Sequence, residues 1–85
     1  MINEYKMLEN GTWFLVSADV PYLLQNAGEF DVLIKATDSS TTAPMHSSAS
    51  FVLEPKGLVN DTILAGNIWA RNKKSTDNVL VTYAK

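Results

Sequence analysis

The sequence predicts an all-β fold, a small antiparallel β-sandwich or barrel of about six to seven strands. Apolar and β-branched residues cluster in short runs, and Gly, Pro, Asn or Asp stands between one run and the next. The runs recur at roughly ten-residue spacing, which is typical of short strands joined by turns. No stretch carries the apolar period of a long helix.

Six runs fit this pattern, and a turn signal accompanies each of them. Gly, Pro and Asx residues supply the mechanism of these turns, through positive φ, a fixed φ or side-chain capping of the backbone. The expected strands cover residues 12–17, 20–25, 30–37, 48–53, 63–71 and 78–83. The turn signals lie at residues 10–11, 19–21, 26–29, 54–57, 60–61 and 72–78.

The first two expected strands read TWFLVS and VPYLLQ. Trp13 and Phe14 are neighbours in the first strand and therefore point to opposite faces. We expect one of these rings in the core and the other exposed or covered by a neighbouring subunit. The second strand begins beside Pro21 and ends at the turn that follows Gln25.

The third expected strand, FDVLIKAT, has the clearest alternation. Phe30, Val32 and Ile34 share one face, and we expect this face in the core. The opposite face carries the charged Asp31 and Lys35, which favour contact with water. Residues 37–50, rich in Ser and Thr, are expected to form a loop and the start of the fourth strand.

The later strands complete the expected core. Phe51 and Leu53 of the fourth strand, Ile68 of the fifth and Val79 of the sixth are predicted to point inward. In the fifth strand Trp69 shares a face with Arg71, and we expect that face to be the less buried one.

Length and composition predict one domain, over residues 10–85, preceded by residues 1–9. The spacing of apolar residues in this first segment does not choose between an arm, an edge strand and a short helical turn. A chain of 85 residues is near the lower limit of independent stability, so self-association is expected. Without a signal-like N-terminal stretch, we expect synthesis and use without export.

Charge and cysteine content exclude several classes of function. The sequence has no Cys and one His, which excludes a disulfide scaffold and a structural zinc site. A net charge of -2 gives no general attraction for nucleic acid, and the apolar runs are far too short to span a membrane. We therefore expect no nucleic-acid partner and no membrane partner.

No constellation of residues predicts catalysis, a cofactor or a metal site. His46 stands in the Ser- and Thr-rich loop and is expected to be exposed rather than catalytic. Glu29 and Asp31 form the nearest pair of carboxylates, but two acids at the start of a strand are more often a solubility device than a glycosidase pair. The expected catalytic, cofactor and metal residues are therefore none.

Aromatic and apolar side chains remain as candidates for binding a partner, because Trp, Tyr and Arg are enriched at the centres of protein interfaces. Trp69 with Arg71 is the most suggestive pair. We expect the N-terminal segment to contribute as well, because it is available to order on a partner. The candidate partner-binding residues are Tyr5, Met7, Leu8, Trp13, Trp69 and Arg71.

The order of five motifs resembles a class of short bacteriophage virion proteins, small β-sandwiches found as head decoration proteins and as modules of tail fibres. The region that the motifs span, residues 17–84, covers about four fifths of the chain. They are SADVPYLLQN at 17–26, FDVLIKATD at 30–38, FVLEPKG at 51–57, GNIWARN at 66–72 and VLVTYA at 79–84. This sequence departs from the class at Lys56, where the turn is usually tighter, and at Tyr83, where a smaller or branched residue is commoner.

The resemblance implies a non-enzymatic structural protein, a capsid decoration protein that binds the head lattice. The alternative that it implies is a tail-fibre module that binds a host receptor or carbohydrate. Its partner would be the major capsid protein or another virion protein, and its oligomeric state a trimer. The protein would be made in the host cytoplasm and reside in the virion.

Overall fold

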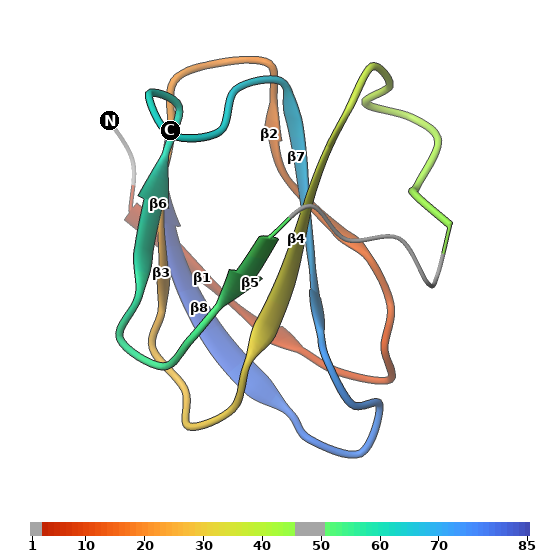
Figure 1. Cartoon of the computed structure of the whole chain (residues 1–85), viewed down its shortest axis with the longest axis vertical. Coiled ribbons are helices and arrows are strands. Elements are labelled where there is room, and N and C mark those ends of the chain that lie inside the picture. The colour runs from red at the N-terminus through yellow and green to blue at the C-terminus, as the bar shows by residue number, and fades with distance from the viewer. Residues whose placement is uncertain (1–2, 46–50) are drawn as a thin grey trace.

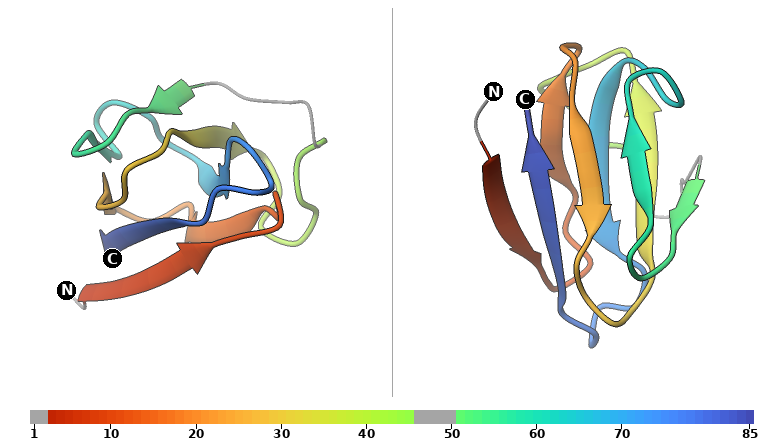
Figure 2. Two further views of the ribbon diagram at one scale, coloured as in Figure 1. Left: turned by 90° about the horizontal axis from the view of Figure 1, so that it is seen from below. Right: turned by 90° about the vertical axis from the view of Figure 1, so that its left-hand side faces the viewer.

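The computed structural model describes residues 3–45 and 51–85, which form eight antiparallel strands and no helix (Figure 1). The strands build two four-stranded sheets that pack face to face (Figure 2). This confirms the predicted small antiparallel β-sandwich. The strands are β1 (Asn3–Leu8), β2 (Phe14–Ala18), β3 (Leu23–Asn26), β4 (Val32–Thr37), β5 (Phe51–Leu53), β6 (Leu58–Asn60), β7 (Asn67–Asn72) and β8 (Val79–Ala84).

The strand order is β1-β8-β3-β6 in one sheet and β2-β7-β4-β5 in the other. The first strand thus pairs with the last, the second with the seventh, the third with the sixth and the fourth with the fifth. This is a long hairpin folded over on itself, the eight-stranded double Greek key of a jelly roll. The right-hand view of Figure 2 looks onto the β1-β8-β3-β6 sheet, with β1 at one edge and β6 at the other.

The turn between β1 and β2 confirms the turn predicted from its Asn-Gly pair. Asn10 has a φ of 61° and Gly11 a φ of 64°. The Thr12 N–H donates to the Glu9 carbonyl at 3.2 Å, which closes a tight β-turn between the two sheets. Asn and Gly are the residues that best tolerate two successive positive φ values. In the turn that follows β5, Lys56 also has a positive φ, of 68°.

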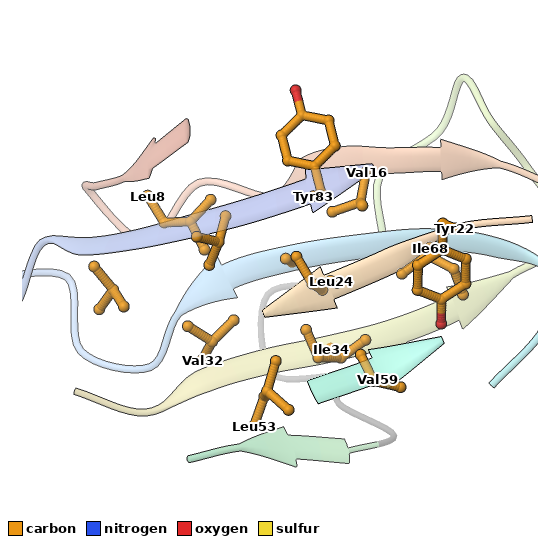
Figure 3. Close-up of a cluster of buried hydrophobic side chains, with 13 residues drawn as sticks. Leu8, Val16, Tyr22, Leu24, Val32, Ile34, Leu53, Val59, Ile68 and Tyr83 are labelled. Atoms are coloured by element: carbon orange, nitrogen blue, oxygen red, sulfur yellow. The ribbon is translucent and has the colours of Figure 1, made fainter. Parts of the chain in front are cut away.

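The core lies between the two sheets (Figure 3). The predicted inward side chains of Val32, Ile34, Leu53, Ile68 and Val79 are all buried there. The predicted Phe51 packs against this cluster while remaining partly exposed. The core is completed by Leu8, Val16, Tyr22, Leu24, Val59, Ala70, Val81 and Tyr83.

The prediction of Phe30 as a core residue is wrong. Its side chain is 45% exposed, because β4 begins at Val32 and Phe30 lies in the preceding loop, outside the pleat. The expected strand at 63–71 is shorter than its apolar run, since β7 begins at Asn67. The short strand β6 (Leu58–Asn60) was not expected, because three residues show no period.

Residues 3–8 form the edge strand β1, one of the three alternatives left open by the sequence. The pairing with β8 is continuous, from Asn3 opposite Ala84 to Leu8 opposite Val79. The separate N-terminal arm is therefore ruled out for these residues, since they belong to the sandwich. His46 and the first residues of the expected fourth strand lie outside the described residues.

Candidate functional site

The outward face of the β1-β8-β3-β6 sheet is the candidate site, because it combines exposure with a lack of charge. Side chains directly opposite each other on paired strands lie on the same face of a sheet. Tyr5 lies opposite Thr82, Thr82 opposite Gln25, and Gln25 opposite Leu58. We call the outward residues of this sheet the uncharged face. They are Asn3, Tyr5, Met7, Leu80, Thr82, Ala84, Leu23, Gln25, Leu58 and Asn60.

Large apolar side chains on the uncharged face are open to solvent. Tyr5 is 77% exposed and Leu58 is 53% exposed, and Met7 and Leu23 are also exposed. A shallow hollow of about 440 Å³ lies among Tyr5, Leu23, Leu58 and the polar Gln25, and Glu4 also contributes to its lining. Apart from Glu4, the hollow offers apolar area and neutral hydrogen-bonding groups, which fit an uncharged partner.

The outward face of the β2-β7-β4-β5 sheet differs, because the chain itself covers part of it. The Trp69 indole N–H donates to the Thr37 hydroxyl and to the Ser39 carbonyl, at 3.1 Å in both cases. The Trp13 indole N–H donates to the Met45 carbonyl at 3.3 Å. The segment that follows β4 therefore folds back over its own sheet.

The expectation that Trp69 and Arg71 lie on the less buried side is wrong. Their exposed fractions are 7% and 6%. The Arg71 guanidinium packs on the Trp13 ring, 5.3 Å from its centre, and donates to the carbonyls of Asn72 and Lys73. Burial lowers the pKa of Arg71 from its usual value. These groups therefore stabilise the fold from the outside of the sheet, and as placed they are not open to a partner.

The remaining candidate residues are also partly buried in the fold and partly open to solvent. Leu8 is fully buried in the core, so it cannot contact a partner in this fold. Tyr5 and Met7, on the outward side of the same strand, lie on the uncharged face. Trp13 is half-buried beside Arg71, and Phe14 packs against the core, which confirms that the two neighbouring rings point to opposite faces.

The acidic residues of the described chain show no assembled site. Asp31 lies 3.7 Å from the Lys73 ammonium, in a surface ion pair, and Glu29 is exposed in the loop before β4. Within residues 3–45 and 51–85, no three His, Cys, Asp or Glu side chains gather where they could hold a metal ion. The same residues include no helix long and apolar enough to cross a membrane.

Several residues of the uncharged face were not expected from the sequence, among them Leu23, Gln25, Leu58 and Thr82. The sequence shows uncharged residues at alternate positions of each strand, but each strand contributes only two or three of them. The sequence does not tell which strands adjoin, so it could not show that these uncharged positions form one surface.

Comparison with known proteins gives no relative from which a role could be transferred. No protein-family model matches the chain, and no curated protein or solved structure is significantly similar to it.

Proposed function

We propose that the protein is a non-enzymatic structural protein of a phage virion, which decorates the head by docking through its uncharged face. The observation that supports this proposal is that face itself, an exposed sheet surface without a charged side chain. The order of motifs that resembles the short virion proteins supports the choice of partner, the major capsid protein.

The chemistry of the face suits docking on another protein. Apolar groups surrounded by neutral amides and hydroxyls bind chiefly by burial, and burial is little affected by salt. Attachment should therefore survive salt of about 0.5 M, where the Debye length is well below the 8 Å of physiological salt. A docking site made of ion pairs would release the protein under the same conditions.

A second candidate is a glycan-binding module of a tail fibre, favoured by the composition of the hollow. An exposed tyrosine ring beside amide and hydroxyl groups is also suited to a sugar, because the ring packs on the apolar face of the sugar and the neutral groups bond its hydroxyls. Tyr5, Gln25 and Thr82 would carry this role. The trimer implied by the phage resemblance remains a prediction for copies bound at capsid sites, distinct from the pairing of free copies argued below.

The two candidates differ in the place and number of copies within the particle. Mass spectrometry of separated heads and tails should find the protein in heads, in a large number of copies, if it is a decoration protein. Recovery in tails alone, in few copies, would support the tail-fibre candidate and contradict decoration. Absence from both would contradict the proposed function altogether.

A pair of matched variants tests the docking face. Leu58→Asp places a charge on the uncharged face, at a side chain that is 53% exposed. Val52→Asp places the same charge on the opposite sheet, at a side chain that is 45% exposed. We expect Leu58→Asp to lower the occupancy of heads by roughly tenfold or more. The new carboxylate would lose its hydration on docking, which costs free energy. Equal occupancy of the two variants would contradict docking through this face.

A further inference from the structure

The free edge of β1 presents a defined set of backbone groups. In an antiparallel sheet each residue directs its N–H and C=O to one neighbouring strand, and successive residues alternate. The Ala27 N–H donates to the Leu80 carbonyl at 2.9 Å, which directs the backbone groups of Leu80 away from β1. Met7, the partner of Leu80 in β1, therefore directs its own groups away from β8. By the same alternation Asn3 and Tyr5 offer their N–H and C=O groups to solvent.

This edge carries some, but not all, of the features that usually prevent pairing with another chain. Natural edge strands are blocked by Pro, by a bulge, or by Lys and other charged side chains that point inward. β1 contains no Pro, and its register with β8 has no shift along Asn3–Leu8. Its two charged residues, Glu4 and Lys6, point inward, opposite Tyr83 and Val81, but they have opposite signs and can therefore pair with the same residues of a second β1.

Two-fold pairing of β1 with a second β1 has one register that suits these charges. When the axis passes through Tyr5, Glu4 of each copy lies directly opposite Lys6 of the other. An axis through Glu4 or Lys6 would instead set like charges opposite each other, which is destabilising. The Tyr5-centred register also brings the outward groups of Asn3 and Met7 into hydrogen-bonded pairs.

We propose that two copies of this chain pair edge to edge through β1, antiparallel and centred on Tyr5, with Glu4 of each copy opposite Lys6 of the other. The two β1-β8-β3-β6 sheets then join into one continuous sheet. Its outward side joins the two uncharged faces, because Tyr5 and Met7 project on that side in both copies. The pairing depends on β1 alone and does not require the proposed virion role.

An exchange of charges tests the register. Lys6→Glu sets Glu4 opposite a second glutamate, and Glu4→Lys sets two lysines opposite each other. We expect each single variant to raise the dimer dissociation constant about tenfold or more, since two opposite-charge pairs become two like-charge pairs. The double variant, Glu4→Lys with Lys6→Glu, restores both pairs and should restore the dimer. Failure of the double variant to recover would overturn the Tyr5-centred register.

A proline at the centre tests the edge itself. Tyr5→Pro removes an N–H that points away from β8, so the pairing within the chain keeps all its bonds, and an edge position of this kind tolerates Pro. We expect this variant to be a folded monomer by circular dichroism and sedimentation. Tyr5→Thr, which keeps the N–H, is the matched control and should retain the dimer. A Tyr5→Pro dimer of unchanged strength would overturn the proposal.

Amide hydrogen exchange of the wild-type protein identifies the edge directly. The amides of Asn3, Tyr5 and Met7 should become protected as protein concentration rises, while those of Glu4 and Lys6, which face β8, should be protected at all concentrations. Sedimentation should give twice the chain mass of 9.4 kDa. A strict monomer, a trimer, or a dimer with no such protection would contradict pairing through β1.

Discussion

Tyr22 shows how one buried hydroxyl makes stability depend on pH. Its side chain is buried, and its hydroxyl donates to the Leu64 carbonyl at 2.6 Å. Burial, and to a lesser degree the charge of Asp61, raises the pKa of Tyr22 to about 12. The folded state therefore holds this proton more tightly than the unfolded state does. The resulting stabilisation is complete below the unfolded pKa of about 10 and is lost as the pH rises toward 12.

We predict that Tyr22→Phe is less stable than wild type at neutral pH and that this difference shrinks in alkali. The lost hydrogen bond should cost about 0.5 to 1.5 kcal/mol. By pH 11 the wild type should have lost about 1 kcal/mol of the contribution from Tyr22, which the variant never had. Urea unfolding of both proteins between pH 8 and 11 measures this difference. A constant difference across that range would contradict the assigned pKa.

Asn72 is a buried amide that joins two turns at one end of the sandwich. Its Oδ1 accepts from the Gly11 N–H at 2.9 Å, in the β1–β2 turn. Its Nδ2 donates to the carbonyls of Lys74 and Asp77, at 2.8 and 3.1 Å, in the β7–β8 connection. A hydrophobic residue of the same size could fill the space but could not satisfy these groups.

We predict that Asn72→Ala lowers the free energy of unfolding by about 1 to 3 kcal/mol or more, because it leaves buried donors and acceptors without partners. Asn78→Ala is the matched control, since Asn78 is exposed, and should change stability by less than about 0.5 kcal/mol. Thermal unfolding followed by circular dichroism measures both. Equal effects at the two positions would contradict the role of the Asn72 amide.

At the scale of the element, β1 serves both the core and the edge. Leu8 is buried against the strands of the sandwich, while Met7, its neighbour, is exposed on the uncharged face. Removing residues 1–9 would therefore remove part of the core, whereas a separate arm could be deleted without loss of stability.

We predict that Leu8→Ala lowers the free energy of unfolding by about 2 to 5 kcal/mol, because it leaves a cavity in the core. Met7→Ala, on the same strand, should cost less than about 1 kcal/mol, since Met7 is 45% exposed and lies outside the core. Chemical denaturation of the two variants and of a chain lacking residues 1–9 provides the measurement. A truncated chain as stable as wild type would show that β1 is dispensable.

At the scale of the whole molecule, the jelly-roll pairing brings the two ends of the chain together. Asn3 lies opposite Ala84, and Leu23 lies opposite Ala84 on the other side of β8. The uncharged face is consequently formed by residues of strands from the start, the middle and the end of the sequence. The covered face of the other sheet depends in turn on the segment that follows β4, from which Ser39 and Met45 bond the two tryptophans.

The sequence alone determined the fold class, most strand positions and the inward side of β4, β7 and β8. Val32 and Ile34 in β4, and Ile68 in β7, are buried as their alternation predicted. These features are local, because the pleat of a strand fixes the direction of its side chains within a few residues. The turn at Asn10 and Gly11 is equally local, since it depends on two dihedral angles.

The tertiary structure alone decided which outward faces are covered. Trp69 and Tyr5 both point away from the core, yet Trp69 is buried beneath a distant segment of the chain and Tyr5 is the centre of an open edge strand. Alternation gives the side of a sheet on which a residue lies. Whether another part of the chain covers that side depends on contacts between residues far apart in sequence, and the same contacts place Gln25 beside Thr82.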